Sequence, residues 1–571
     1  MVRMATNHEM NDATTTAAAT TTTTTQIEDE VCHSPAEDHR PSRILFGSCS
    51  SLHYKPQPLW SVIRSRNATA FIWGGDAIYA DDRVAHKPIL GGLLQTPVYL
   101  EATPDHQAKL YEQQRNEPGY KALLDSGIHI FGTMDDHDFG LNNGDSTYKY
   151  KKESGIEFVK FLGLDPKSNP MARRAYQGLG VYGVQVYDFD RPRGEELLTD
   201  DEAGLDPDVL VHDIELRNET DGLSTKRPLG TKSVAIFALD IRTNKTPWIK
   251  KFPQRFQLDV HGDFLGEGQW KWFETALSRS TAAVNIVVTG LQVHGNRYID
   301  GSLIEEWSRF PRAQHRLYQA LLQDNVQSPI LVTGDVHFAQ ILRKHCRRAT
   351  HPEPALIRPL LEVTTSGMTH SWGSPNGVCS RTDLNPLCQI RYFSAIFRPI
   401  ATISHWMNPW PELVLDEKGN MQYTLDLNFA EFDFNWEARN VTVRLLGTEA
   451  NEVPLLSNTW RLDELSGNHP GIIGQTTTDR DFERTRKQLQ SLSLLERDDN
   501  WVCVHYRGIA NPFHAALGIA AMWGSVFLLM LGPFFLFPIA ILIVLSRKRS
   551  AFKHQHQNGE FKATILKYKA S

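Results

Sequence analysis

Short apolar runs that end at a glycine-containing turn recur along the chain, and five of them occupy residues 43–49, 71–82, 128–138, 285–294 and 330–337. Each run contains a segment of strand length, and each turn carries Asp, His, Cys, Tyr or Gln side chains. Helical patterns fill the stretches 58–66, 104–126, 270–277 and 313–323. This alternation predicts an α/β fold. In such folds the turns after neighbouring strands collect at one edge of the sheet, where ligands bind.

Residues 412–446 follow a different pattern, in which strand-like segments follow one another without helices between them. Two apolar runs at 412–416 and 421–429 flank a Gly-Asn turn, and residues 432–436 and 440–446 alternate between apolar and polar with a period of two. These segments predict a closing β-meander. Residues 188–231 are acidic and aperiodic, which is typical of a surface insertion.

The segments before and after residues 42–449 differ from them in composition. Residues 1–41 are rich in Thr and Ala, have too little apolar surface to fold, and are predicted to be disordered. They contain no recognisable secretory signal. Residues 450–512 are polar and irregular, with one helical stretch near 480–495, and are predicted to form a stalk. The segment between these flanks, residues 42–449, is predicted to be one catalytic domain.

Residues 513–546 are predicted to form a single transmembrane helix. The run 515–545 carries no charged residue, and at about 1.5 Å per residue it is longer than a hydrocarbon core of about 30 Å. Residues 547–571 form a basic tail, which the positive-inside rule keeps in the cytosol. The catalytic domain is then expected at a membrane, outside the cell or in a lumen.

The missing signal sequence leaves this topology open. Either the last helix inserts as a C-terminal anchor with a cytosolic catalytic domain, or the natural N-terminus differs from Met1. Four N-glycosylation motifs are consistent with export: Asn67, Asn218, Asn244 and Asn440. Six cysteines show no Cys-x-x-Cys spacing, and Cys379 and Cys388 either form a bridge or remain free thiols.

Composition narrows the class of function. The 571 residues are 41% hydrophobic and 10% aromatic, which is typical of a globular chain. The net charge is -6 and no Lys/Arg-rich run precedes the C-terminal tail, so no nucleic-acid partner is expected. The chain is expected to act as a monomer.

The turn that follows residues 71–75 concentrates candidate chemistry. Gly74 and Gly75 allow the backbone to turn sharply, so that Asp76 and Tyr79 can point into one cavity. Carboxylate and phenolate oxygens in one cavity indicate a metal site. Cys49 ends the first strand beside this cavity, although a lone cysteine is more often a buried structural thiol.

Taken in order, the motifs resemble those of the PhoD-like phosphatases (alkaline phosphatase D family) of the calcineurin-like metallophosphoesterase superfamily. The resemblance covers residues 43–447 and is carried by Gly47-Ser-Cys49, Gly74-Gly-Asp-Ala-Ile-Tyr-Ala-Asp81, Met134-Asp-Asp-His-Asp138, Gln292, Gly334-Asp-Val-His337 and the segments 365–372 and 428–433. The family implies a four-layer αββα sandwich of the metallophosphoesterase type, followed here by the predicted C-terminal transmembrane helix.

The resemblance also implies which residues hold metal ions. Cys49, Asp76, Tyr79 and His337 would hold Fe(III), which suits thiolate, phenolate and imidazole donors. A second ion, Ca or else Mn or Mg, would share Asp76. Its other ligands would be an all-oxygen set made of Asp136, Asn142 and Asp335.

The implied function is that of a membrane-anchored, metal-dependent phosphoesterase whose substrates are phosphomonoesters, phosphodiesters or both. A metal-bound hydroxide would attack phosphorus. His137, oriented by Asp138, would donate a proton to the leaving alkoxide or stabilise the phosphorane-like state. Gln292 and His370 would line the substrate pocket, whereas His294 is expected to be structural.

Two other hypotheses fit parts of the pattern. A catalytically inactive member of the fold could be a scaffold or binding protein at a membrane, but loss of ligands would mark that case, and every expected ligand position is filled. A non-hydrolytic redox iron protein would explain ligation by Cys and Tyr. It would not explain the acidic set of Asp135, Asp136, Asp138 and Asp335.

Overall fold

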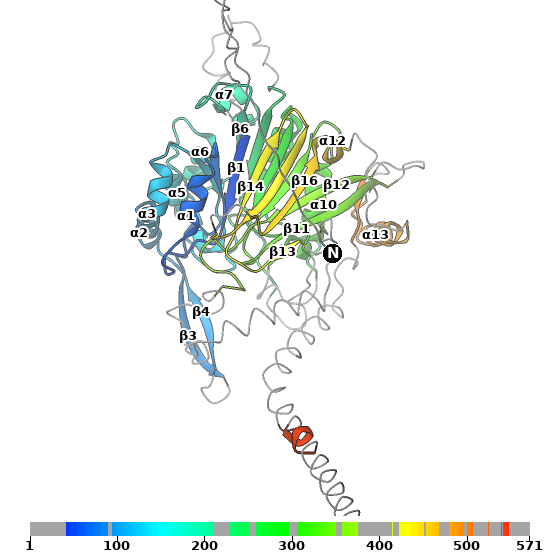
Figure 1. Cartoon of the computed structure of the whole chain (residues 1–571). Helices are drawn as coiled ribbons and strands as arrows, with labels where there is room; N and C mark the ends of the chain where they lie inside the picture. Colours follow the sequence, from blue (N-terminus) through cyan, green and yellow to red (C-terminus); the bar gives the residue numbers. More distant parts are fainter. Residues whose placement is uncertain are drawn as a thin grey trace, which may run out of the picture. The chain divides into compact units, whose positions relative to one another are not determined.

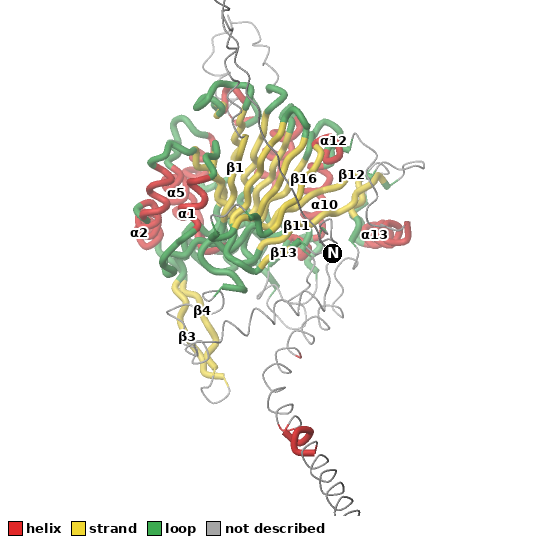
Figure 2. Tube along the Cα trace, in the orientation of Figure 1, coloured by secondary structure: helices red, strands yellow, loops and turns green. Residues whose placement is uncertain are grey.

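The computed structural model of the chain describes residues 42–89, 94–208, 229–249, 258–295, 305–349, 357–374, 414, 422–449, 453–467, 479–495, 500–505, 524, 538 and 541–546. Within these residues the backbone forms two large sheets, a separate two-stranded hairpin, and helices that cover the sheets (Figure 1; Figure 2). The predicted mixed α/β class is therefore confirmed.

Six strands form the first sheet, in the order β16 (Leu456–Arg461), β15 (Asn440–Leu446), β14 (Phe429–Asn435), β1 (Ser42–Gly47), β2 (Ala70–Gly74) and β5 (His129–Thr133). Strands β1, β2 and β5 are parallel neighbours, so their carboxyl ends lie at one edge. β14 and β15 are the predicted meander strands, and they pair from Phe429 opposite Leu446 to Asn435 opposite Asn440.

Nine strands form the second sheet. Its main path runs β13 (Tyr423–Thr424), β11 (Ala339–Arg348), β12 (Arg358–Thr364), β10 (Pro329–Thr333), β9 (Val284–Thr289), β8 (Ser233–Ala238), β6 (Gly183–Asp188) and β7 (Leu197–Leu198), and β17 (Trp501–Cys503) pairs with β11 off this path. The central strands β8, β9, β10 and β12 are parallel. Their carboxyl ends therefore also share one edge.

The described helices are mostly short. They are α1 (Leu59–Ser65), α2 (Pro104–Arg115), α3 (Pro118–Leu124), α4 (Asp136–Phe139), α5 (Lys151–Leu162), α6 (Pro170–Gln177), α7 (Asp200–Ala203), α9 (Gly266–Ser278), α10 (Pro311–Leu321), α12 (Leu462–Leu465), α13 (Asp479–Ser491) and the 3-10 turn η3 (Trp307–Arg309).

The two sheets share one apolar core. Ile236 and Val288 of the second sheet belong to the same buried cluster as Phe46 of the first sheet. The alternate residues Phe237 and Val287 belong to another cluster, which they form with helices α9 and α10. Because successive side chains of a strand point to opposite faces, the second sheet is covered by the first sheet on one face and by helices on the other.

The outer face of the first sheet is also covered by helices. The ring of Trp73 on β2 contacts Trp60 of α1, Tyr120 of α3 and Phe161 of α5. The tryptophan indole also donates a hydrogen bond of 3.1 Å to the Tyr120 hydroxyl. The order of layers is thus helix, sheet, sheet, helix, as the αββα prediction describes.

Two local predictions need correction. The stretch 104–126 forms two helices rather than one, because Pro118 has no N–H to continue the first helix and instead begins the second. In the predicted insertion, the described residues 188–208 belong to the fold. Its strand β7 pairs with β6, and Asp206 forms an ion pair of 2.8 Å with the buried Arg174.

Much of the segment 450–512 is not a stalk. Strand β16 continues the first sheet, and β17 pairs with β11 of the second. Cys346 of β11 and Cys503 of β17 lie opposite each other and form a disulfide. Apolar side chains of α13 and β17, including Phe482 and Val502, form a small core of their own. The chain is therefore fastened to the domain up to residue 505.

Several sequence predictions fall outside the described residues. These are the disordered N-terminus at 1–41, the bridge between Cys379 and Cys388, most of the transmembrane helix at 513–546, and the basic tail at 547–571. In the described part of the chain, no helix has both the length and the apolar character needed to cross a bilayer. The transmembrane helix stays a prediction.

We expect the substitution Cys503→Ser to destabilise the domain. The disulfide joins positions 157 residues apart, and loss of such a crosslink typically costs about 2–4 kcal/mol. Chemical denaturation of the wild type and the variant measures the difference. The double variant Cys346→Ser, Cys503→Ser should match the single variant, since both remove the same bond. Two free thiols at these positions in the unreduced, unfolded wild type would contradict the assignment.

Candidate metal centre and active site

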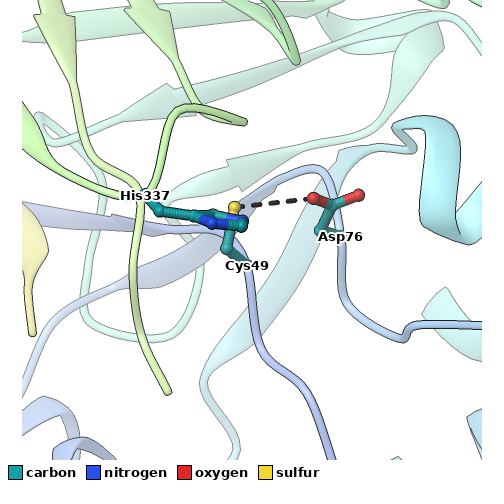
Figure 3. A group of neighbouring side chains, drawn as sticks. All are labelled: Cys49, Asp76 and His337. Carbon is teal, nitrogen blue, oxygen red and sulfur yellow. Dashed lines mark hydrogen bonds between the residues drawn. The ribbon is translucent and has the colours of Figure 1, made fainter. Parts of the chain in front are cut away.

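The candidate ligands come from the carboxyl ends of strands in both sheets. Cys49 follows β1, Asp76 follows β2, and Asp335 and His337 follow β10. Figure 3 shows the side chains of Cys49, Asp76 and His337 converging from three separate loops. The topology explains this meeting, because parallel strands deliver their following turns to a common edge.

The donor atoms of the first group lie close together. The Cys49 Sγ lies 3.5 Å from Asp76 Oδ2, and the Tyr79 hydroxyl lies 3.3 Å from the same oxygen and 3.1 Å from His337 Nε2. Donor atoms of Cys49, Asp76 and His337 all lie within 4.8 Å of one another. Ser366, which sequence reasoning missed, contacts Cys49 Sγ at 3.1 Å and accepts the backbone N–H of His337.

Four of the candidate ligands have a left-handed backbone. The φ angles are 60° for Cys49, 54° for Asp76, 66° for Asp335 and 56° for His337. Residues other than glycine rarely adopt this conformation, and each costs roughly 1 kcal/mol or more. Such strain persists where the surrounding structure holds it, and it clusters at functional sites.

Two glycines permit the close approach of these loops. Gly75 has a φ of 100°, and a Cβ there would lie 2.5 Å from the Cβ of Asp135. A Cβ on Gly334 would lie 2.8 Å from the carbonyl oxygen of Gly74, so the loops after β2 and β10 nearly touch. The predicted need for a glycine holds for Gly75, whereas a Cβ on Gly74 would make only ordinary contacts.

A second group of donors is made of carboxylates only. Oxygens of Asp135, Asp136 and Asp335 lie within 4.8 Å of one another. Asp135 forms an ion pair of 2.5 Å with the fully buried Arg242, which also pairs with Glu305. The other oxygen of Asp135 is buried and accepts no hydrogen bond in the described structure. A hard cation would fit this oxygen-rich, buried site.

Electrostatics favour a cation at both groups. Burial and neighbouring carboxylates raise the pKa of Asp76, and burial and Asp136 raise the pKa of Asp335 to about 7. Burial and the Asp76 charge raise the pKa of the Cys49 thiol. Burial opposes ionisation of Asp136, but His137 and Arg242 outweigh it and lower its pKa to about 2. A bound cation would favour the anionic form of each donor.

His137 is held by Asp81, not by Asp138 as predicted. Its Nδ1 lies 2.5 Å from Asp81 Oδ1, and its ring stacks on Tyr79 with centroids 4.1 Å apart. Burial lowers the pKa of His137, but Asp81, Asp136 and Asp76 outweigh burial and raise it.

Asp138 points to the other side of the α4 turn. Its carboxylate accepts the backbone N–H groups of Ile78 and Asp135 and the hydroxyl of Tyr111. With these bonds it caps the turn and joins it to the loop after β2. Asp138 is next to His137 in the sequence, so the motif predicts the wrong partner. Asp81 is far from His137 in the sequence but contacts its imidazole in the fold.

The remaining predicted site residues differ in their contacts. His370 contacts the rings of His337 and Tyr79, at 4.2 and 5.1 Å between centroids. Gln292 is fully buried and donates to Thr364 Oγ1. Asn142 donates its backbone N–H to Asp81, and its role as a ligand stays a prediction. His294 is fully buried and contacts the Tyr318 hydroxyl and the carbonyl of Leu360.

Residues 226–384 match the sequence model of the family described as PhoD-like phosphatase. This match confirms the resemblance to the PhoD-like phosphatases. The PhoD-like segment contains Gln292, Asp335, His337 and His370, whereas Cys49, Asp76, Tyr79 and the other candidate residues of the N-terminal loops precede it. The description of this family as a phosphatase implies a phosphoesterase.

Two solved structures show a distant likeness to this chain. A structure of PhoD is 12% identical, with 80% of this chain and 78% of that chain covered and a TM-score of 0.46. GAP50, described as the anchor in the inner membrane complex of Plasmodium, is 10% identical, with 74% of this chain and 89% of that chain covered and a TM-score of 0.35. No curated protein matches the chain.

We expect affinity for a hard divalent cation to fall as the pH falls below about 7. In the metal-free protein the pKa of Asp335 is raised to about 7, so below that pH the cation must displace a proton. If binding releases one proton, the association constant for the cation falls about tenfold for each unit by which the pH is lowered. Calcium titration calorimetry between about pH 5 and about pH 8 measures this slope. Asp335→Asn should flatten it, and pH-independent binding by the wild type would contradict the expectation.

We expect Asp81→Asn to lower kcat by about 100-fold and to change the pH profile. Since Asp81 raises the pKa of His137, its loss should move the basic limb of the kcat/KM profile to lower pH. Asp138→Asn is the matched control. It should reduce the free energy of unfolding and leave the basic limb in place, because Asp138 does not contact the imidazole. If the basic limb moves in Asp138→Asn and not in Asp81→Asn, the result would support the sequence prediction that Asp138 orients His137.

Proposed function

We propose that the chain is a membrane-anchored metal phosphoesterase that hydrolyses phosphomonoesters, phosphodiesters or both. The convergence of Cys49, Asp76, Tyr79 and His337 beside the carboxylates Asp136 and Asp335 is the observation that carries this proposal. Two adjoining donor groups that both draw on the loop after β10, through His337 and Asp335, suit a pair of ions, which is a common arrangement for transfer of a phosphoryl group to water.

The chemistry of the donors suggests which ions the two groups hold. Thiolate, phenolate and imidazole at Cys49, Tyr79 and His337 suit Fe(III). The all-oxygen group suits Ca, Mn or Mg, with Asp136 and Asp335 as ligands and Asp76 shared between the ions. When bound, the ions would supply Lewis acidity for the phosphoryl oxygens and for water.

His137 is the proposed proton donor to the leaving oxygen. Asp81 engages Nδ1 and thereby fixes the ring, so Nε2 is the nitrogen that can face a substrate. The raised pKa of His137 keeps this nitrogen protonated to a higher pH than usual. A protonated imidazole at the leaving oxygen would stabilise the alkoxide as the ester bond breaks.

His370 is the proposed contact for the remaining part of the substrate. Its Nδ1 lies 3.1 Å from Thr369 Oγ1, which leaves Nε2 to meet a phosphoryl or ester oxygen. Burial lowers the pKa of His370, as do the charges of His337 and His137. A neutral imidazole can donate a hydrogen bond without adding a further cation to the site.

The proposed location is a membrane surface outside the cytosol. A disulfide between Cys346 and Cys503 is typical of an oxidising compartment. The glycosylation motifs at Asn67 and Asn244 are exposed, as export would require. The described helical residues 541–545 are apolar and 45–64% exposed, which supports a membrane anchor over a soluble tail.

We expect the full-length protein in detergent to hydrolyse a chromogenic phosphomonoester or its diester analogue, with iron in the purified sample. Asp76→Asn should reduce activity by about 100-fold or more, because it weakens both donor groups. Cys49→Ala should lose iron. The exposed residue Asp125 provides the matched control, and Asp125→Asn should retain activity and metal.

A folded wild type that contains no iron and remains inert after loading with Fe and Ca would contradict the proposal. That result would favour the hypothesis of an inactive scaffold at a membrane. Iron bound without hydrolysis of either ester would favour a redox iron protein.

A further inference from the structure

The hairpin formed by β3 (Asp82–Ile89) and β4 (Leu94–Leu100) grows directly out of the candidate active site. It projects from the body of the domain as a separate two-stranded sheet (Figure 1). β3 begins at the residue after Asp81, and β4 ends at Leu100, close to the loop that carries His137.

Both ends of the hairpin are bonded to the segment that carries His137. Before β3, the N–H of Ala80 donates to the carbonyl of His137 at 3.2 Å. After β4, the N–H of Ala102 donates to the carbonyl of Gly140 at 2.8 Å. The base of the hairpin is thus fixed relative to the proposed proton donor, and a side chain at that base has a defined position beside it.

Tyr99 of β4 is such a side chain. It is half-buried, and its ring centroid lies 6.0 Å from that of His137 with the planes tilted by 52°. Tyr79 covers one face of the imidazole, and Asp81 holds the Nδ1 edge. In the described structure, Tyr99 is thus a second tyrosine ring beside His137, in addition to Tyr79.

A leaving group must approach His137 closely to receive a proton. Hydrogen-bond reach is about 2.6–3.2 Å between heavy atoms, so the carbon atoms next to the leaving oxygen would lie about 4–5 Å from the imidazole. The Tyr99 ring, centred 6.0 Å from the centre of the imidazole, could contact those atoms in a substrate whose leaving group enters on the Tyr99 side of His137.

Resting on the proposed phosphoesterase function, we propose that Tyr99 is a specificity-determining residue that contacts the leaving group and favours alcohols with an aromatic ring next to the ester. Aromatic pairs contribute beyond simple burial when their rings meet edge-to-face or offset. The hairpin base then selects the leaving group, while the metal ligands and His137 act on the phosphoryl group and its ester oxygen.

The test compares benzyl phosphate with ethyl phosphate, or their methyl diesters if only diesters are substrates. Both leaving alcohols are weakly acidic, so both need a proton, and they differ mainly in the ring. For the full-length, metal-loaded protein, Tyr99→Ala should lower the benzyl-to-ethyl ratio of kcat/KM about threefold to tenfold. The change should arise mainly from a higher KM for the benzyl ester.

Two variants control this experiment. Tyr99→Phe keeps the ring and should retain the wild-type ratio. Leu100→Ala alters the exposed neighbour whose side chain points to the opposite face of β4, and it should retain the ratio too. A ratio that falls equally in Leu100→Ala would overturn the proposal, because disturbance of the hairpin would then be the cause.

Two further outcomes would overturn it in different ways. Equal losses of kcat for both esters in Tyr99→Ala, with an unchanged ratio, would show that Tyr99 only positions His137. A wild type that hydrolyses p-nitrophenyl phosphate but shows no preference between benzyl and ethyl esters would reject this inference and leave the proposed function intact. A wild type inert toward every ester would reject both.

Discussion

The candidate site depends on the confinement of several carboxylates in one buried place. Asp76, Asp135, Asp136 and Asp335 come from loops of both sheets, and burial disfavours the charge on each of them. Among the described residues the nearby positive charges are few, and Arg242 and Lys245 are shared with Glu305. Bound cations would favour the ionised form of all these carboxylates together. Metal binding would then stabilise this edge of the fold.

The backbone around the site is arranged to hold these donors in place. Left-handed conformations at Cys49, Asp76, Asp335 and His337 cost free energy, and the close contact at Gly334 leaves no room for a side chain. The two layers of the fold compensate for this cost, because strands on both sides of the shared core are almost fully buried. Rigid strands thus present strained loops, which keeps the donors together before any ion or substrate binds.

Elements outside the central sheets complete the site and the domain. The β3–β4 hairpin brings Asp81 and Tyr99 to His137 from opposite ends of one chain segment. In the second sheet, β17 pairs with β11, and the buried Lys344 donates to the carbonyl of Val504. The first of these elements places two side chains beside the candidate proton donor, and the second ties residues 501–505 to the second sheet.

The sequence by itself determined the α/β class, the central strands and most of the candidate ligands. These features are local, because a buried strand and the polar turn that follows it are adjacent in the chain. Only the tertiary structure decided that Asp81 rather than Asp138 holds His137, that Ser366 contacts Cys49, and that Cys346 pairs with Cys503. Each of these contacts joins residues far apart in sequence, and no periodicity or spacing encodes which distant loop will meet which. For the same reason the sequence after residue 450 wrongly predicts a stalk, since its own pattern does not encode its pairing with strands that lie far away in the chain.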